Sequence, residues 1–224
     1  MLAMISNITR RITCGLLLII SFESLANTTP NSCNYHFEHY EKEFDLPKNI
    51  LSSVSIVETG KWDKNKKSMT AWPWTVNNAG KSYFFNNKQE AVLFVSELIV
   101  KGQRNIDVGC MQVNLKHHPY AFENLYQAFE PKYNIAYAAS LLKKLYINSA
   151  SWVSAIAQYH SGEKHRGINY AQKVLKQWYK KSDAKPTSSD TLSLAHKKSF
   201  RAPGRNPIKY KNRRKLLTNE IGKA

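Results

Sequence analysis

The stretch ILSSVSIVETG, residues 50–60, combines an amphipathic helix pattern with a carboxylate at its end. Four of its apolar residues recur at the spacing that places side chains on one face of an α-helix: Ile50, Leu51, Val54 and Val57. Gly60 ends the pattern, and Glu58 follows directly after the apolar face. At that end the helix dipole disfavours an anion, and apolar surroundings raise a carboxyl pKa. Glu58 is therefore either a solvated surface residue or a proton donor that works near neutral pH.

The N-terminal residues have the features of an export signal. Arg10 and Arg11 precede the apolar run CGLLLII, residues 14–20, and small residues follow up to Ala26. The run is shorter than the roughly 20 residues of a membrane-spanning helix. We expect residues 1–26 to be a signal peptide that is cleaved after Ala26, with an uncleaved anchor as the alternative. The remaining chain is then periplasmic or secreted, with no stable membrane span.

Two cysteines follow the predicted signal peptide, Cys33 and Cys110. In an oxidising compartment an even pair favours a disulfide, and two unrelated thiols are the alternative.

The net charge of +17 is concentrated near the C-terminus. Residues 181–224 contain 12 lysines and arginines, 3 acidic residues and three prolines, with few large apolar residues. This composition predicts a disordered basic tail. Such a tail either keeps the protein soluble or contacts an anionic polymer or membrane surface. The export signal argues against nucleic acid as the partner.

The residues between these ends, 27–180, predict one mainly helical domain. We expect Asp45 to cap the helix of residues 50–60. Further helices are predicted from the stop and start signals, beginning at Asn87, Pro131, Ser151 and about Asn169. Residues 61–87 are aromatic and rich in turn formers, which predicts a small β or loop element with a hairpin around Asn78 to Gly80.

Three further strings stand out: DVGCMQVN at 107–114, NIAYAASLLKKL at 134–145 and AIAQYHSG at 155–162. Together with Glu58-Thr59-Gly60 ahead of them, their order and spacing resemble the soluble lytic transglycosylase family, which has a goose-type-lysozyme-like fold. The resemblance covers roughly residues 40–165. The usual family strings are Glu-Ser-x-Gly, Gly-Leu-Met-Gln and Ala-Tyr-Asn-x-Gly, and this sequence departs from them at three positions: Thr59, Cys110 and His160.

A narrower resemblance concerns the small subgroup found with secretion or pilus systems, where a transglycosylase opens the wall for a machine. It depends on Asp107, on the Trp72-Pro73-Trp74 string and on the His118-Pro119 pair. The resemblance implies peptidoglycan glycan strands as substrate, and the subgroup adds components of a secretion or pilus machine as partners. It implies no cofactor. His36 and His39 have the spacing of metal ligands, but no cysteine or carboxylate cluster accompanies them, so we expect no metal site.

The resemblance implies a reaction that one carboxyl can perform. Glu58 protonates the glycosidic oxygen between N-acetylmuramic acid and N-acetylglucosamine. It then takes the proton of the muramic C6 hydroxyl, which closes a 1,6-anhydro ring. Thr59 is expected to orient the carboxyl, and Tyr159 to hydrogen-bond near Glu58 or the oxocarbenium-like centre. Gln112 is expected to bind a sugar amide, while Met111 either lines the cleft or packs in the core.

The remaining expected substrate contacts are aromatic. His160 replaces the usual asparagine after Tyr159. Trp74 and Tyr83 belong to an aromatic stretch, residues 72–85, that either stacks on sugars or forms a small satellite core.

Two other classes of function fit the same fold. One is a hydrolytic lysozyme, which needs a second carboxylate, with Asp63 and Asp107 as the candidates. The other is a non-catalytic protein that binds the wall during assembly.

Overall fold

The computed structural model describes residues 32–182, so the predicted signal peptide and nearly all of the predicted basic tail lie outside the described residues. The described chain is mainly helical with short antiparallel strands, as predicted. Its helices are α1 (Cys33–Glu43), α2 (Ile50–Thr59), α3 (Lys88–Val100), α4 (Leu125–Ala128), α5 (Pro131–Ser149), α6 (Trp152–His160) and α7 (Lys164–Ser182). Its strands are β1 (Gly60–Asp63), β2 (Ser68–Ala71), β3 (Thr75–Asn78), β4 (Lys81–Phe84), β5 (Ile106–Val108) and β6 (Val113–Asn114).

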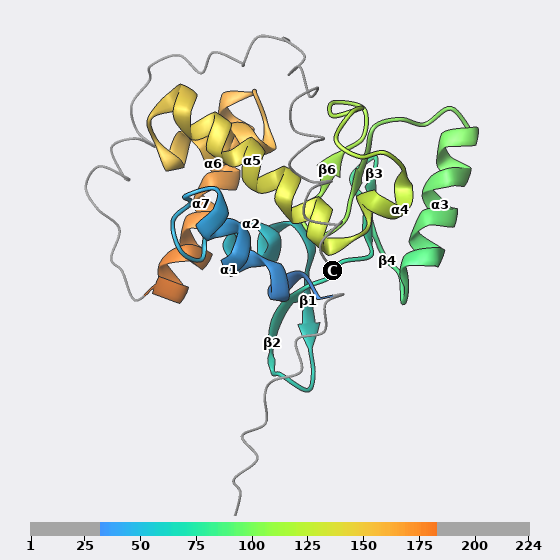
Figure 1. Ribbon diagram of the computed structural model, residues 1–224, viewed down its shortest axis with the longest axis horizontal. Coiled ribbons are helices and arrows are strands. Elements are labelled where there is room, and N and C mark those ends of the chain that lie inside the picture. Colours follow the sequence, from blue (N-terminus) through green and yellow to red (C-terminus); the bar gives the residue numbers. More distant parts are fainter. Residues whose placement is uncertain (1–31, 183–224) are drawn as a thin grey trace, which may run out of the picture.

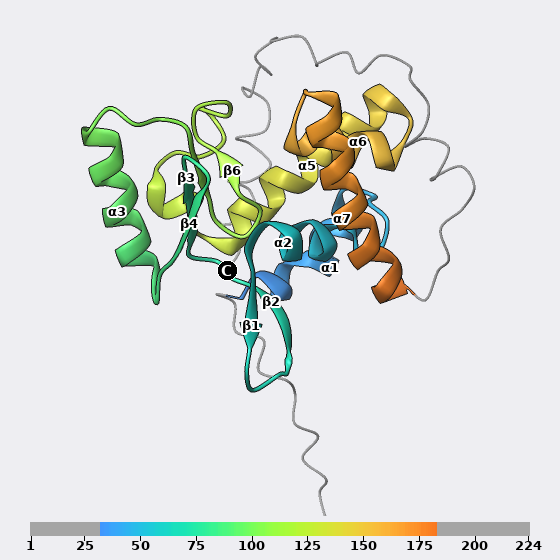
Figure 2. The ribbon, with the colours of Figure 1, turned by 180° about the vertical axis from the view of Figure 1, so that it is seen from behind.

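The elements form two lobes that meet at the start of α5 (Figure 1 and Figure 2). Helices α1, α2, α6 and α7 gather around most of α5, whose inward face is small and apolar and is fully buried: Ile135, Ala138, Ala139 and Leu142. The other lobe contains α3, α4 and a four-stranded antiparallel sheet with the order β4-β3-β5-β6. A separate apolar cluster fills this lobe. Within residues 32–182, no helix is long and apolar enough to cross a membrane.

Several predicted helix boundaries are confirmed. The side chains of Asn87 and Ser151 cap α3 and α6 by accepting hydrogen bonds from the backbone N–H groups of Glu90 and Ser154. The last helix begins at Lys164, five residues before the predicted start at Asn169.

The predicted N-cap of α2 is wrong. Asp45 lies in the turn after α1 with a φ of 49°, and its carboxylate pairs with Lys143 Nζ at 2.8 Å. The start of α2 is stabilised instead by Glu41, a buried residue of α1. Its carboxylate accepts hydrogen bonds of 2.9 Å from the backbone N–H groups of Asn49 and Leu51. A side chain of the preceding helix thus satisfies N–H groups that would otherwise lack partners.

Two hairpins lie between α2 and α3. The predicted one joins β3 to β4 through Ala79 and Gly80, which both have positive φ. The other, between β1 and β2, was not predicted. It begins directly after α2 and projects from the body of the molecule (Figure 1).

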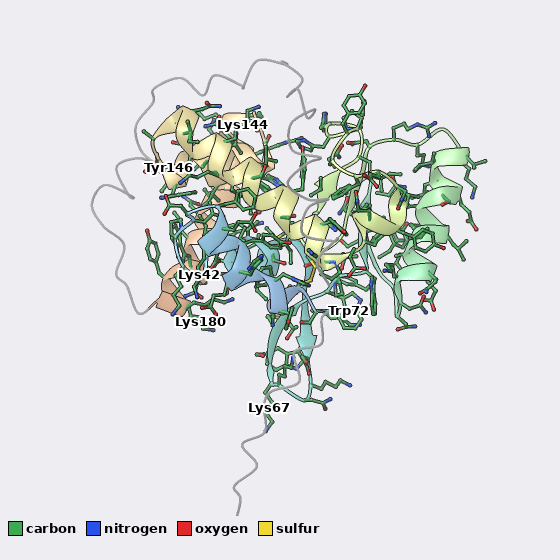
Figure 3. All side chains as sticks on the ribbon, in the orientation of Figure 1. Lys42, Lys67, Trp72, Lys144, Tyr146 and Lys180 are labelled. Carbon is green, nitrogen blue, oxygen red and sulfur yellow. A yellow bond between two sulfur atoms is a disulfide. The ribbon has the colours of Figure 1, made fainter. Side chains whose placement is uncertain are left out.

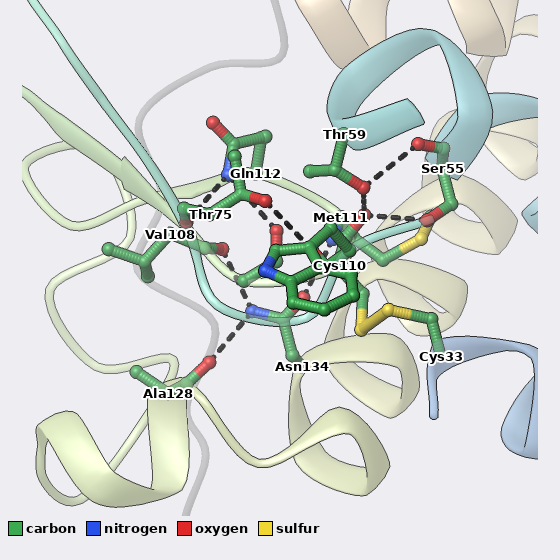
Figure 4. Close-up of a disulfide and its surroundings, with 12 residues drawn as sticks. Cys33, Ser55, Thr59, Thr75, Val108, Cys110, Met111, Gln112, Ala128 and Asn134 are labelled. Carbon is green, nitrogen blue, oxygen red and sulfur yellow. Dashed lines mark hydrogen bonds between the residues drawn. A yellow bond between two sulfur atoms is a disulfide. The ribbon is translucent and has the colours of Figure 1, made fainter. Parts of the chain in front are cut away.

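Cys33 and Cys110 form the predicted disulfide (Figure 4). It joins the first residue of α1 to the turn between β5 and β6, and both cysteines are fully buried. The bridge therefore fixes the DVGCMQVN string to the helical lobe.

Replacing both cysteines with serine should lower the free energy of unfolding by about 4 kcal/mol, because the bridge closes a loop of 77 positions in the unfolded chain. Urea denaturation of the wild type and the double variant measures this difference. A reducing agent should lower the stability of the wild type and leave that of the double variant unchanged. Equal stability of the oxidised wild type and the variant would contradict the prediction.

Candidate active site

The turn between β5 and β6 is held by one buried amide, that of Asn134 on the first turn of α5 (Figure 4). Its Oδ1 accepts a hydrogen bond of 2.8 Å from the backbone N–H of Met111. Its Nδ2 donates to the carbonyl groups of Val108 and Ala128 at 3.0 and 2.9 Å. One side chain therefore fixes the turn, the end of β5 and the end of α4 to α5.

Gly109 packs directly against this amide. Its φ is +79°, and a Cβ atom at this position would lie 2.3 Å from Asn134 Nδ2. The position therefore requires glycine for its backbone conformation and for the space that the amide occupies.

The same turn is attached to α2 by two buried hydroxyl groups. The carbonyl of Cys110 accepts hydrogen bonds from Ser55 Oγ at 2.7 Å and from Thr59 Oγ1 at 3.1 Å. Ser55 and Thr59 are four residues apart and so share one face of the helix. The contact fixes the end of α2, and therefore Glu58, relative to the turn.

Glu58 is partly buried, and its Oε1 accepts a hydrogen bond of 2.6 Å from the hydroxyl of Tyr170 on α7. Burial raises the pKa of Glu58 to about 8, and the nearby Asp107 carboxylate adds to the rise, whereas the hydrogen bond from Tyr170 opposes it. The Tyr170 ring is stacked on that of His160, with centroids 4.3 Å apart and planes within 3°. Glu58 is thus protonated at neutral pH and held in one orientation.

Asp107 lies on β5 between two fully buried residues, Ile106 and Val108, so its side chain is on the opposite face of the strand from the core. Burial raises the pKa of this carboxyl, while the hydrogen bond from Asn114 Nδ2, 2.7 Å long, and the nearby His117 lower it. The structure therefore brings a second carboxyl within electrostatic range of Glu58.

Asp63, the other candidate for a second carboxylate, has a different role. Its Oδ1 accepts hydrogen bonds from the backbone N–H groups of Asn65 and Lys66, so it orders the turn of the β1–β2 hairpin.

Tyr170 is the site residue that sequence reasoning missed. It shares a helical face with Ala171 and Val174, so its spacing has the appearance of a core position. Tyr159, which was expected near Glu58, donates its hydroxyl proton to the Met111 carbonyl at 2.7 Å. Burial raises the pKa of Tyr159, and the charge of Glu58 adds to that rise. Tyr159 therefore lies near the carboxyl but acts on the backbone of the turn.

Thr59 and Met111, which were both expected to act at the substrate site, have buried side chains. The Thr59 side chain is buried, and its single hydroxyl proton is shared between the carbonyls of Ser55 and Cys110, so it does not orient the carboxyl by donating to it. The Met111 side chain is fully buried in the helical lobe, which is the core-packing alternative.

Gln112 and His160 remain accessible. Gln112 Nε2 donates to the carbonyls of Thr75 and Gly109 at 3.1 and 3.0 Å, and its Oε1 has no hydrogen-bond partner within residues 32–182. His160 is accessible to solvent, although one face of its ring is stacked on Tyr170. The partial burial of the imidazole lowers the pKa of His160.

Trp74 and Tyr83, the two aromatic residues expected to contact sugars, are both partly buried against the apolar cluster of the sheet lobe. Tyr83 packs on Phe94, with ring centroids 4.7 Å apart, against the core of the sheet lobe, which is the satellite-core alternative. Trp74 contacts the same cluster. It also lines a pocket of about 310 Å³, whose other lining residues are Asn87, Lys88, Gln89, Glu130 and Pro131. Glu58 is not among the residues that line this pocket.

The described residues thus form a mainly helical fold with a small antiparallel sheet, and a partly buried glutamate with a raised pKa lies at the end of α2. The family model of the transglycosylase SLT domain matches residues 36–185, more than half of the chain. The chain therefore belongs to this family of lytic transglycosylases, whose substrate is cell-wall peptidoglycan. No curated protein and no solved structure gives a significant match.

Gly109→Ala should destabilise the protein strongly, because the added methyl group meets the Asn134 amide. Gly102→Ala is a matched control, since Gly102 has nearly the same φ, +80°, and open space around it. Backbone strain alone should cost the control about 1–2 kcal/mol. Gly109→Ala should cost about 1–3 kcal/mol more, the range of overpacking. Denaturation curves test the difference, and equal losses would show that the amide contact is unimportant.

Glu58→Gln should stabilise the folded protein increasingly as the pH rises from about 4.5 to about 8. The folded pKa of about 8 exceeds the ordinary 4.5, so the folded protein keeps a proton that the unfolded chain releases in this range. Wild-type stability therefore falls across the window by up to about 5 kcal/mol, and the amide lacks this loss. Thermal melts of the wild type and Glu58→Gln at pH 4.5 and pH 8 measure this difference in stability. Glu97→Gln, which makes the same change at an exposed position, is the matched control.

Proposed function

We propose that the protein is a lytic transglycosylase that cleaves the bond between N-acetylmuramic acid and N-acetylglucosamine and leaves 1,6-anhydromuramoyl ends. The observation that supports this most directly is the Glu58 carboxyl, with its pKa near 8 and its hydrogen bond to Tyr170. A group that must donate a proton and then accept one works best with a pKa close to the working pH.

In the proposed reaction Glu58 donates its proton to the glycosidic oxygen, and the bond to C1 of the muramic sugar breaks. The resulting carboxylate then accepts the proton of the C6 hydroxyl, whose oxygen bonds to C1. No water is consumed, and Glu58 ends protonated as it began. Tyr170 donates to Oε1 throughout, so it stabilises the transient carboxylate and leaves Oε2 to face the substrate.

Asp107 has a proposed electrostatic role. Its negative charge favours the protonated form of Glu58 and stabilises positive charge that develops at C1. Asn114 keeps the carboxyl in place through a hydrogen bond of 2.7 Å. The Gln112 Oε1 atom is free to accept a hydrogen bond from the N–H of a sugar acetamido group.

The presence of Asp107 also favours a second candidate function, a hydrolytic lysozyme. Two carboxyl groups can perform hydrolysis if the second one acts as nucleophile or activates a water molecule. The product then has a reducing muramic end and is heavier by one water molecule.

The site residues and the cellular setting are part of the proposal. Residues 1–26 would direct export, with cleavage after Ala26. The protein would act on the wall from the periplasm or outside, in the service of a secretion or pilus machine. Residues 27–180 would form the catalytic domain and residues 181–224 a basic tail.

Mass analysis of fragments released from purified sacculi tests the function. The wild type should release 1,6-anhydro ends, and Glu58→Gln should cleave at least about 10²-fold more slowly, as expected for a missing general acid. Asp107→Asn should slow cleavage but keep the anhydro product.

Three outcomes would contradict parts of this proposal. Reducing ends that disappear in Asp107→Asn would establish the lysozyme. Cleavage by Glu58→Gln at the rate of the control Glu97→Gln would remove Glu58 from the mechanism. A wild type that binds sacculi without releasing fragments would leave only a wall-binding role.

A further inference from the structure

The hairpin of β1 and β2 exposes two large apolar side chains. Trp62 and Met69 are direct partners in the strand register, and their exposed fractions are 58% and 46%. The hairpin projects from the body of the protein in both views (Figure 1 and Figure 2). Adjacent exposed apolar groups on a projecting element are typical of an interaction surface.

Trp62 and Met69 are not the residues that pack the hairpin against the body of the protein. The residues on the same hairpin face nearer the body are Gly60 and Ala71, and Ala71 is buried. Met69 Cε reaches back over Gly60, where an added Cβ would lie 3.0 Å from it. Trp62 lies further out, so more than half of its surface remains open to a ligand.

The hairpin is also strongly basic. Residues 60–71 contain four lysines and one acidic residue, Asp63. Asp63 orders the turn through the backbone and lies 4.0 Å from Lys66 Nζ, while Lys61 Nζ lies 4.5 Å from the centroid of the Trp72 ring. Lys64 and Lys67 form no ion pair with any residue that the structure describes. Figure 3 shows Lys67 at the far end of the hairpin and Trp72 near its base.

The hairpin lies within reach of the candidate active site. Trp62 is four residues from Glu58, and an extended chain spans at most about 3.6 Å per residue, so their Cα atoms are no more than about 14 Å apart. A polymer of several sugars bound beside Glu58 is therefore long enough to reach Trp62.

We propose that the β1–β2 hairpin is a binding arm for the peptidoglycan strand outside the catalytic cleft. Trp62, with Met69 beside it, stacks on a sugar ring of the strand, and Lys64 and Lys67 face the carboxylates of its stem peptides. The polyanionic, sugar-rich strand matches the combination of an aromatic surface and unpaired cations. The identity of this ligand rests on the proposed function.

Binding to intact sacculi in a Glu58→Gln background tests the arm without digestion of the ligand. Trp62→Ala combined with Met69→Ala should weaken co-sedimentation about tenfold, as expected when an aromatic anchor is removed. Trp62→Phe, which keeps a ring, should retain most of the binding. The matched control is Leu93→Ala, which removes a 63% exposed apolar side chain from α3 and should change nothing.

Lys64→Gln combined with Lys67→Gln should weaken binding at low salt and reduce its salt dependence, because exposed charges are screened over about 8 Å at physiological ionic strength. Thermal melts check that each variant is folded. Hairpin variants that bind like Leu93→Ala would overturn the proposal.

Binding to vesicles of phosphatidylglycerol and phosphatidylcholine tests whether the ligand of the hairpin is a membrane surface rather than the cell wall. If the hairpin variants no longer bind vesicles but still bind sacculi like the parent protein, the hairpin binds a lipid surface. That result would overturn the proposal. These measurements do not depend on cleavage. Loss of sacculus binding in the hairpin variants would therefore support the arm even if the digest showed no anhydro product.

Discussion

The buried amide of Asn134 is the interaction on which the site depends. It satisfies the N–H of Met111 and the carbonyls of Val108 and Ala128 in a place without access to water. An apolar residue of similar size would remove all three hydrogen bonds, and each buried backbone group left without a partner costs about 1–3 kcal/mol. The glycine at 109 follows from the same amide, because no larger residue fits against it. Two residues far apart in the sequence therefore constrain each other through one contact.

The side chains of the family strings serve mainly to position the backbone. Thr59 and Tyr159 each donate a hydroxyl proton to a carbonyl of the turn, and Met111 fills the core beneath it. The polar groups that do not hold the turn include the carboxyl of Glu58, the Oε1 atom of Gln112 and the side chain of His160. The unusual pKa of Glu58 is possible because these backbone contacts hold the helix end in a partly dry environment.

Local signals in the sequence predicted five of the seven helices in residues 32–182 and two of their caps, since Asn87 and Ser151 act on residues three positions away, but α1 and α4 were not predicted. The cap of α2 could not be predicted in this way, because Glu41 reaches it from another helix. The β1–β2 hairpin has strands of four residues joined by a lysine-rich turn, and it lacks the alternation of a half-buried strand. Tyr170 was missed because an apolar helical spacing does not distinguish a core tyrosine from one that donates to a carboxyl.

The bond between Tyr170 and Glu58 joins residues 112 positions apart, and this separation has a consequence for the order of assembly. All the motif strings precede Tyr170 in the chain, so a nascent protein contains every one of them before the partner of its acid has been synthesised. Closing so long a loop is slow relative to forming local helices. The carboxyl thus acquires its final environment only when α7 docks on α2, after the whole of the chain up to Tyr170 has been made.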